Sequence, residues 1–460
     1  MAESKHSAKV QMVEGSLWKN VPKFAIPVAL TGILGQLFNA ADIAVVGRFT
    51  GAQGTLSMAA VGANSAIVGL ILNLFMGIAL GATVVIATAL GRKDEETVKQ
   101  AVGTSVLFSF LTGALTALIG EVFAAPFLAS LNVPSEVLPG AVLYLRIYLA
   151  GLPVILLYNF EAAIFRAAGE TRLPLLVLAM SGALNVVLNL IFVIGLHMTV
   201  DGVAYATVIS NAVSSAMLLV MLFRTQLPLR IAWCDIRFHA ETLSGILRIG
   251  VPAGLQGAVF AIANILIQSA INSLGTTVIA ASSAALNIEI FCYNVLSSFG
   301  QASTTFTGQN FGAGNLERCR KVLRVCLIED AIAAASTVAL VLLTGRQLLS
   351  IFNTDPEVIA IGYVRLVLIL GSYAFSMCYE VMSGYMRGFG ISFMPALLTT
   401  IGVCGTRFFW ILAVFPRHRT FRMIMLVYPI SLGITALLIL LLLLYCRPAA
   451  RFAAQQKKVS

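Results

Sequence analysis

Charged residues are scarce in this chain. Of its 460 residues, 11% are Asp, Glu, Lys or Arg, whereas 59% are hydrophobic. A soluble globular protein is nearer a quarter charged. A chain of this length cannot enclose so much apolar surface in a water-soluble core, so the composition excludes a large soluble helical protein and indicates a protein embedded in lipid.

Clusters of catalytic or metal-binding side chains are also missing. The seven cysteines form no Cys-x-x-Cys pair, and the four histidines are dispersed. No Gly-rich phosphate-binding loop is present. A membrane enzyme, such as an acyl or phosphoryl transferase, would need a His, Asp or Cys cluster at one membrane face. We therefore expect no catalytic residues and no cofactor, and the enzyme is the weaker alternative.

Apolar windows long enough to cross a membrane, about 20 residues, recur along the whole chain. They lack the two-residue alternation of a porin strand, and helices satisfy their own backbone in lipid. The sequence therefore predicts an all-α polytopic membrane protein with about twelve transmembrane helices. The windows are 24–46, 58–90, 99–124, 141–165, 173–196, 202–223, 244–270, 279–308, 322–344, 358–386, 394–415 and 423–446.

The basic residues predict how these helices are oriented. The net charge is +10, and most of the 30 Lys and Arg residues lie at one set of span ends if the chain starts inside and alternates. The positive-inside rule then predicts a multi-pass protein of the cell membrane (inner or plasma membrane) with both termini in the cytoplasm. The basic loop 416–422 is the exception. The polar N-terminus predicts no cleavable signal peptide. Because the basic residues lie at span ends, no nucleic-acid partner is expected.

The chain repeats itself. Pro27 recurs as Pro252 after 225 residues, and Arg166 recurs as Arg387 after 221. Six spans per repeat is an even number, so the second half enters the membrane in the same orientation as the first. We predict two six-helix lobes related by a parallel pseudo-two-fold repeat. The predicted segments are a cytoplasmic lead-in at 1–23, an N-lobe at 24–223, a cytoplasmic linker at 224–243, a C-lobe at 244–446 and a cytoplasmic tail at 447–460.

Two repeated bundles are typical of transporters that work by alternating access. Receptors and channels also use repeats, and duplication can simply enlarge a scaffold. Charged residues inside the spans favour a transporter, because a charge at the bilayer centre costs at least ~2.5–3.5 kcal/mol. Glu161 and Glu380 lie at related positions of the two repeats, which favours a structural role. Asp42 and Glu289 each occur in one lobe only, which indicates a specific task.

Polar side chains that could bind a cation together with Asp42 lie in two other spans of the N-lobe. Asn185 and Asn189 are four residues apart and share one face of the fifth span, while Thr207 lies in the sixth. A carboxylate, two amide carbonyls and a hydroxyl form an oxygen-rich set that suits hard cations. With one acid, the set matches a monovalent ion or a proton.

The chain resembles the multidrug and toxic compound extrusion (MATE) family. The likeness covers roughly residues 15–446. It rests on "IPVALTGILGQLFNAADIAVVGR" in the first span, "LGRKDEETVKQAV" after the second, "IFRAAGETRLP" after the fourth, "NVVLN" in the fifth and "GQNFGAGNLERC" after the eighth.

The resemblance implies a two-lobed antiporter that exports organic, often cationic and amphipathic compounds against an inward flow of Na⁺ or H⁺. It also implies that the coupling cation binds at Asp42, Asn185, Asn189 and Thr207, and that this cation can be Na⁺. In some relatives the position of Asn189 is Asp, so this chain has one acid fewer. Another branch uses acids in the seventh and tenth spans. The seventh span here has none, so a DinF-like prokaryotic member fits better.

The resulting hypothesis is exchange by competition. Asp42 takes up H⁺ or Na⁺, the first span bends around Pro27, and the affinity for the substrate falls. Glu289, Glu161 and Glu380 are secondary candidates for cation binding. The expected partners are small organic substrates, the coupling cation and the lipid bilayer, and the expected oligomeric state is a monomer.

The substrate cavity is predicted to have apolar, polarizable lining, which suits promiscuous binding. For each candidate residue taken singly, ordinary helix packing is the favoured explanation. The candidates are Gln36, Phe38, Met76, Phe160 and Tyr293. The alternative functions are a lipid-linked precursor flippase and a metabolite exporter of the same superfamily, but a flippase would carry more central cations.

Overall fold

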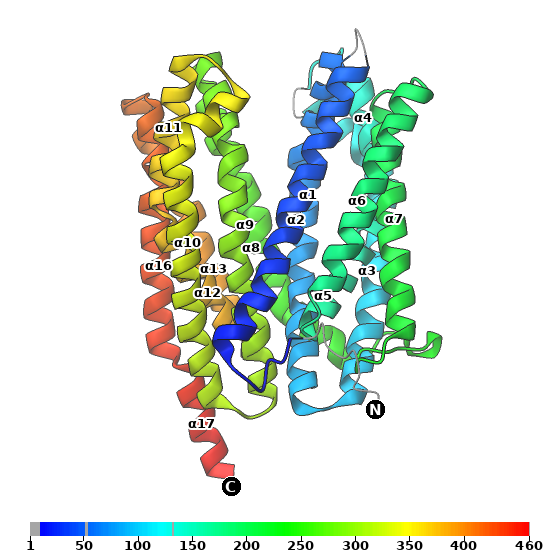
Figure 1. The fold of residues 1–460 in the computed structure, drawn as a ribbon, viewed down its shortest axis with the longest axis vertical. Helices are drawn as coiled ribbons and strands as arrows, with labels where there is room; N and C mark the ends of the chain where they lie inside the picture. Colours follow the sequence, from blue (N-terminus) through cyan, green and yellow to red (C-terminus); the bar gives the residue numbers. More distant parts are fainter. Residues whose placement is uncertain (1–9, 51–53, 131–132, 460) are drawn as a thin grey trace, which may run out of the picture. The chain divides into compact units, whose positions relative to one another are not determined.

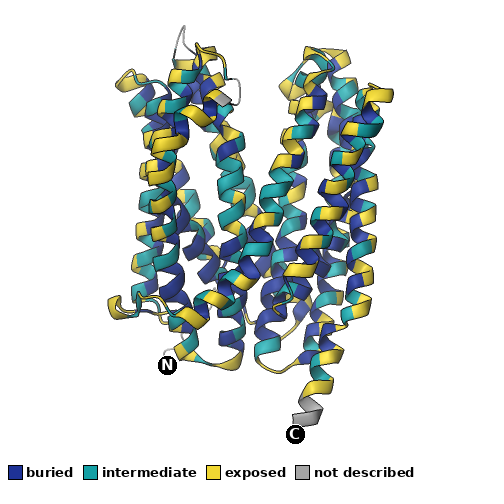
Figure 2. Ribbon diagram, turned by 180° about the vertical axis from the view of Figure 1, so that it is seen from behind, coloured by how far each residue is buried: buried dark blue, intermediate teal, exposed yellow. Residues whose placement is uncertain are grey.

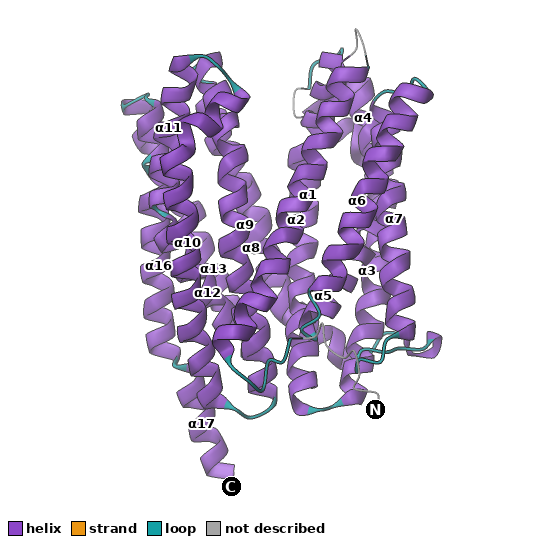
Figure 3. Cartoon of the chain, viewed as in Figure 1, coloured by secondary structure: helices purple, strands orange, loops and turns teal. Residues whose placement is uncertain are grey.

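The computed structural model describes residues 10–50, 54–130 and 133–459. Within these ranges the chain is helical and contains no β-strand (Figure 1 and Figure 3). Ten helices are long and apolar enough to cross a membrane, and the number rises to 12 if each of two bent helix pairs is one span. The predicted all-α membrane fold with about twelve spans is therefore confirmed.

The helices extend beyond the apolar windows, because polar residues at their ends continue the same helical backbone. The bounds are α1 Leu17–Phe49, α2 Gly54–Arg92, α3 Glu95–Ser130, α4 Leu138–Ala150, α5 Leu152–Ala167, α6 Arg172–Leu190, α7 Val200–Arg224, α8 Ala240–Asn272, α9 Thr276–Gly312, α10 Leu316–Phe352, α11 Pro356–Gly371, α12 Tyr373–Gly388, α13 Phe393–Thr399, α14 Thr406–Phe409, α15 Phe421–Met425, α16 Val427–Cys446 and α17 Pro448–Val459. Short π-helical turns interrupt two spans at η2 Ile191–Gly195, η4 Thr400–Gly405 and η5 Trp410–Val414.

The described residues pack into two units. Unit 1 contains Thr31–Ile86 and Asp94–Leu247, and unit 2 contains Val10–Leu30, Ala87–Lys93 and Arg248–Ser460. The helix α1 is therefore shared between the units, since its first part packs in unit 2 and its remainder in unit 1. The segment boundaries that the sequence suggests stay a prediction. Residues 1–9 of the predicted lead-in lie outside the described residues. The helix α1 begins at Leu17, within the lead-in predicted at 1–23.

Unit 1 has an apolar exterior as well as an apolar core. A buried apolar cluster joins α2, α3, α4, α5 and α7. Along α3, Leu111, Leu115, Leu118 and Val122 are all exposed, with Leu118 70% exposed. Their spacing of three and four residues places them on one face. Figure 2 shows many such exposed positions, and an apolar exposed stripe of this kind is the face that a bilayer covers.

The linker after α7 is held against α3. The hydroxyl of Thr104 donates to the carbonyl of Arg237 at 3.2 Å and accepts from the backbone N–H of His239 at 3.2 Å. Gly103 lies against the carbonyl of Asp235, where a Cβ would not fit. The polar stretch between the spans is thus an ordered part of unit 1.

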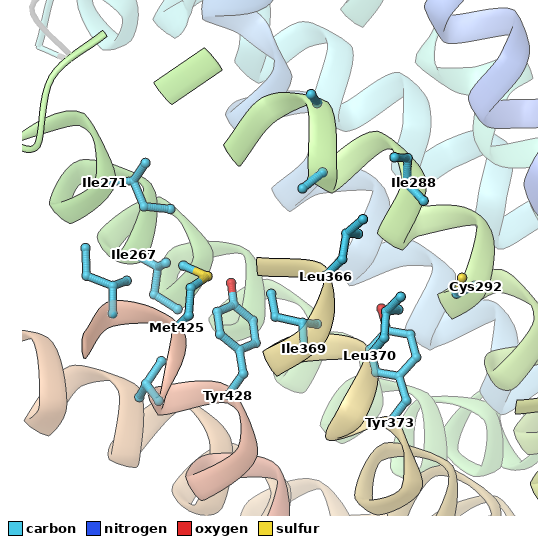
Figure 4. Close-up of a cluster of buried hydrophobic side chains, with 14 of the residues drawn as sticks. Ile267, Ile271, Ile288, Cys292, Leu366, Ile369, Leu370, Tyr373, Met425 and Tyr428 are labelled. Atoms are coloured by element: carbon cyan, nitrogen blue, oxygen red, sulfur yellow. The ribbon is translucent and has the colours of Figure 1, made fainter. Parts of the chain in front are cut away.

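Unit 2 has a core between α8, α9, α11, α12 and the helices α15 and α16. Figure 4 shows Ile267, Ile288, Leu366 and Tyr428 converging in this cluster. A second cluster packs Val21, Phe24 and Val28 of α1 against α9 and α10. The rings of Phe24 and Phe306 meet edge to face with centroids 5.8 Å apart. This contact explains why the start of α1 belongs to unit 2.

Unit 2 also contains a reciprocal contact between the two sequence repeats. Gly91, at the end of α2, lies against the carbonyl of Gln309, and Gly312 lies against the carbonyl of Thr88. Gln309 follows Thr88 by 221 residues, and Gly312 follows Gly91 by the same number. The two contacts are therefore equivalent under the repeat, as in an isologous interface. A Cβ at either glycine would collide with backbone.

The same spacing relates the two bent helix pairs. The chain bends by 52° between α4 and α5 at Gly151, and by 40° between α11 and α12 at Ser372. Ser372 follows Gly151 by 221 residues. Pro153 explains the first bend because it has no N–H to continue the ladder. At the second, Ser372 donates its hydroxyl to the carbonyl of Ile369 at 2.6 Å, a local bond that competes with the helix.

Candidate cation site

Asp42 lies in the part of α1 that belongs to unit 1, and its residue is only 8% exposed. Both carboxylate oxygens have donors. The Nδ2 of Asn189 donates to Oδ1 at 2.6 Å, and the Oγ1 of Thr207 donates to Oδ2 at 3.2 Å. The structure thus brings together side chains from α1, α6 and α7, although Asn189 and Thr207 lie well over a hundred residues from Asp42 in the sequence.

Asn185 completes the predicted set. It precedes Asn189 by one helical turn on α6, and its Oδ1 accepts from the Nδ2 of Asn189 at 3.2 Å. Both asparagines are buried. The Oδ1 of Asn189 has no hydrogen-bond donor within the described chain. Five side-chain oxygens therefore gather here, and one of them is unused.

The helix α6 changes its winding directly beyond this pair. The π-helical turn η2 begins at Ile191, two residues after Asn189. Such widened turns are rare and often accompany functional sites. Next to them, Val45, Val46, Val193 and Val203 form a small apolar cluster in the same unit. The polar set therefore has an apolar neighbour that keeps water away from this side.

No basic side chain of the described residues forms an ion pair with Asp42. The ion pairs of that part of the chain include Arg146–Glu121, Arg365–Glu289 and Arg387–Glu380. A buried carboxylate without a counter-charge is costly unless it binds a proton or a cation. The same residues hold no group of three or more His, Cys, Asp or Glu side chains fit for a metal. One acid with neutral oxygens suits a proton or a monovalent ion rather than a divalent one.

Sequence reasoning missed two tyrosines near this site. Tyr144 and Tyr148 of α4 are both buried and lie within electrostatic range of Asp42. Their rings stack with centroids 6.2 Å apart. The four-residue spacing in "YLRIY" was the available signal, because it places both phenols on one face of a helix.

Comparison with known proteins identifies the family. A family model described as MatE matches residues 27–191 and 252–410, which together exceed half of the chain. The chain belongs to the MatE family. Its two matches start at Pro27 and Pro252, the positions that define the sequence repeat. The prediction of a MATE-family transporter, rather than an enzyme, is confirmed. Membership of the DinF-like branch stays a prediction.

Individual MatE relatives agree with this assignment. "Probable multidrug resistance protein YoeA" of Bacillus subtilis is 28% identical over 397 residues, which is 85% of each chain. "Probable multidrug resistance protein NorM" of Thermotoga maritima is 27% identical over 398 residues, which is 85% of this chain and 84% of that relative. A crystal structure of MATE in complex with MaL6 superposes with a TM-score of 0.87 at 24% identity and covers 98% of this chain and 100% of that one. At this identity the superposition shows the fold alone.

Two secondary candidates of this MatE chain have charged partners. Glu289 of α9 accepts from Arg365 of α11 at 2.8 and 3.1 Å, and Arg365 also donates to Ser282 at 2.7 Å. Glu380 of α12 accepts from the hydroxyl of Tyr293 at 3.1 Å and lies 3.9 Å from Arg387. Both acids belong to unit 2, whereas the Asp42 set belongs to unit 1.

Glu161 has no such partner. It lies in α5, is fully buried, and neither carboxylate oxygen has a hydrogen bond within the described part of the chain. Ser215 of α7 interacts with it outside hydrogen-bond geometry. Glu161 precedes Arg166 by five residues, whereas Glu380 precedes Arg387 by seven. The two glutamates therefore differ in both helix position and environment.

The predicted cavity residues divide by exposure. Gln36 is exposed, Phe38 is half-buried against Gly182, and Met76 and Tyr293 are 52% and 42% exposed. Phe160 is fully buried and packs against Phe108 with ring centroids 6.0 Å apart. The lining role of Phe160 stays a prediction, and in the structure its ring packs between α5 and α3.

Proposed function

We propose that this MatE-family chain is a secondary active antiporter, coupled at Asp42 to H⁺ or Na⁺, that exports organic and often cationic, amphipathic compounds. One observation supports this most directly. Asp42 is buried at the junction of three helices, has donors from neutral side chains only, and lacks a basic partner among the described residues. The names of the relatives, both multidrug resistance proteins, support the substrate class.

The oxygen set accounts for reversible binding of a small cation. Asp42, Asn185, Asn189 and Thr207 supply the ligands, with a single negative charge among them. Asn189 donates its N–H to Asp42 and leaves its own Oδ1 without a donor in the described chain. If its amide turns over, that oxygen joins the carboxylate in facing a Na⁺ ion. A proton needs no such turn, since it can bind to one carboxyl oxygen while Oδ1 continues to accept from the N–H of Asn189.

Coupling follows from the division of α1. Its first part packs in unit 2 and the part that carries Asp42 packs in unit 1. Pro27 lies just before the changeover and cannot donate to the carbonyl of Lys23, so the helix has a weak point there. Neutralising Asp42 alters its bonds to α6 and α7, and the bend at Pro27 passes the change along α1. Cation and substrate need only prefer different states.

Membrane placement completes the proposal. The long apolar helices make the chain a multi-pass membrane protein. We further infer from the distribution of basic residues that both termini face the cytoplasm and that a monomer, surrounded by lipid, suffices for transport.

Transport by purified protein in liposomes tests the proposal. A fluorescent lipophilic cation, rhodamine 6G, is loaded, and a pH gradient or a Na⁺ gradient is imposed separately. The expected result is efflux driven by one gradient, reduced in Asp42→Asn to the level of empty liposomes. Glu121→Gln is the matched control, because Glu121 forms an exposed ion pair elsewhere in unit 1. Full activity of Asp42→Asn would refute the site, and no response of the wild type to either gradient would refute the antiporter.

A further inference from the structure

A second carboxylate, in unit 2, is buried without a hydrogen bond. Asp330 lies on α10, is 0% exposed, and neither of its oxygens has a hydrogen-bond donor within the described chain. The adjacent Glu329 is 8% exposed, and its Oε2 is likewise unpaired there. This pair contrasts with Glu289 and Glu380, which the structure supplies with arginines.

The acid that interacts electrostatically with Asp330, Glu380, adds negative charge rather than neutralising it, whereas the neighbouring thiols are uncharged. Glu380 and Cys378 of α12 and Cys326 of α10 itself interact with it electrostatically. Tyr293 of α9 donates a hydrogen bond to Glu380. Glu380 also pairs with Arg387. The part of α1 that packs against α10 presents apolar residues, namely Val21, Phe24, Ala25 and Val28.

These surroundings assign different states to the two acids. Glu380 has a phenol and a guanidinium to stabilise its charge. Asp330 has a negative neighbour and, among the described residues, no donor and no ion-pair partner, so its ionised form is strongly disfavoured in a desolvated site. The neutral, protonated form of Asp330 avoids this cost.

We propose that Asp330 is a second proton-binding site of this transporter, built in unit 2 with Glu380 as its acidic neighbour. The ligand is a proton rather than a metal ion. The described residues form no group of three or more His, Cys, Asp or Glu side chains that could hold a metal ion. The oxygens of Asp330 are completely buried, so a metal ion there could neither keep its hydration shell nor replace it with protein ligands. When the proton leaves, the carboxylate of Asp330 becomes charged, and rebinding of a proton makes the side chain neutral again.

The site is independent of the proposed coupling at Asp42. Its residues belong to unit 2, whereas Asp42 and its partners belong to unit 1. If both proposals hold, the chain binds a proton in one repeat and a cation in the other. A bare structural role for Asp330 would instead require a permanently neutral side chain that never exchanges its proton.

Infrared difference spectroscopy of the purified full-length protein distinguishes the two roles. A protonated carboxyl group gives a C=O stretching band that disappears when the group ionises. Spectra recorded between acid and alkaline pH should show a titrating band that persists in Asp42→Asn, persists in the control Glu121→Gln, and is lost in Asp330→Asn. Asn keeps the shape of a neutral Asp, so this variant is expected to fold. A spectrum of Asp330→Asn with every titrating band of the wild type would overturn the proposal.

A second variant keeps the test decisive if Asp330→Asn does not fold. Glu380→Gln removes the negative neighbour of Asp330, so the remaining band should titrate at lower pH than in the wild type. An unchanged titration in Glu380→Gln, or a band that never responds to pH, would also overturn the proposal. Loss of transport in Asp42→Asn has no bearing on either outcome, so failure of one proposal is distinguishable from failure of the other.

Discussion

The side-chain amide of Asn189 donates to a carboxylate oxygen of Asp42 at 2.6 Å, and this bond joins α6 to α1. Thr207 adds α7 on the other oxygen at 3.2 Å. Because both donors are neutral, three helices meet at a charge that none of them cancels. The proposed binding or release of a cation at Asp42 would therefore change the electrostatics of a helix junction, and such a change can couple a site to a conformational change.

Replacing Asn189 by Asp should strengthen Na⁺ binding. The variant Asn189→Asp puts a second carboxylate beside Asp42, and two acids attract a monovalent cation more strongly than one. We expect Na⁺ affinity to rise at least ~10-fold, which corresponds to about 1.4 kcal/mol. The unfolding temperature of the purified protein, measured against NaCl with choline chloride at equal ionic strength, reports this affinity because a bound ligand stabilises the folded state.

The control for that experiment is Asn294→Asp in α9. Asn294 is half-buried and donates to the carbonyl of Ile290 at 2.9 Å, far from the Asp42 set in the sequence and in unit 2. It adds the same charge without adding a ligand to the site. Equal Na⁺-dependent stabilisation of the two variants would contradict the assignment of Asn189 as a cation ligand.

Glu289 is expected to be essential for stability rather than for coupling. Its pair with Arg365 is enclosed, with side-chain exposures of 13% and 4%. Glu289→Gln leaves the guanidinium buried without a counter-charge, and removing one member of a buried pair costs about 3–5 kcal/mol. We expect a marked fall in unfolding temperature in detergent. The double variant Glu289→Leu with Arg365→Met removes both charges and should recover most of the loss.

An exposed ion pair supplies the comparison. Arg146 and Glu121 approach to 3.2 Å, but their side chains are 46% and 57% exposed. Glu121→Gln should therefore lower the free energy of unfolding by less than ~1 kcal/mol. If Glu289→Gln is equally harmless, the buried pair does not carry the energetic role assigned to it.

The sequence predicted the members of the Asp42 set because residue type and span position sufficed. A lone acid in one apolar window and amides at helical spacing in another limit the possibilities strongly. The environment of the other acids was not predictable in this way. Glu289 and Arg365 are separated by 76 residues, and their pairing depends on which faces of α9 and α11 meet. The isolation of Asp330 likewise depends on packing with α12 and α1.

The helix bounds illustrate a second limit. The window 58–90 marked the apolar part of α2, yet the helix runs from Gly54 to Arg92. Hydropathy detects the segment that lipid covers, whereas the helix continues until its backbone hydrogen bonds end. The cavity-lining role predicted for Phe160 meets a related limit. Aromatic character alone does not separate a ring that lines a cavity from one that packs against Phe108.

Gly91 is predicted to be intolerant of a methyl group. A Cβ at this position would collide with the carbonyl of Gln309, which is backbone and cannot move aside cheaply. We expect Gly91→Ala to destabilise the packed state by about 1–3 kcal/mol through overpacking. Gly69→Ala on the same helix is the control. Nothing lies within 4 Å of its added Cβ, so the gain in helix propensity should make it neutral or stabilising by ~0.5–1 kcal/mol. Similar unfolding temperatures for both variants would argue against the close contact.

Arg318 is expected to hold the segment before α1 in place. Its Nε donates to the carbonyl of Met12 at 3.2 Å, and its Nη2 donates to the carbonyls of Glu14 and Gly15 at 2.9 Å each. Asn310 adds a bond to the same carbonyl of Met12 at 3.1 Å. Arg318→Met keeps the apolar stem but removes the donors. Since hydrogen bonds to charged groups contribute about 1.5–3 kcal/mol, local opening of residues 10–15 should become at least ~10-fold more frequent.

Amide hydrogen exchange of the purified protein measures that opening directly. Faster exchange should be confined to the segment before α1, because α1 itself is anchored in unit 2 by the Phe24–Phe306 contact. Arg320→Met is the matched control, since Arg320 lies two residues further along α10 and is exposed. Exchange in Arg318→Met that matches both the wild type and this control would show that packing of Met12, which is 2% exposed, holds the segment without the arginine.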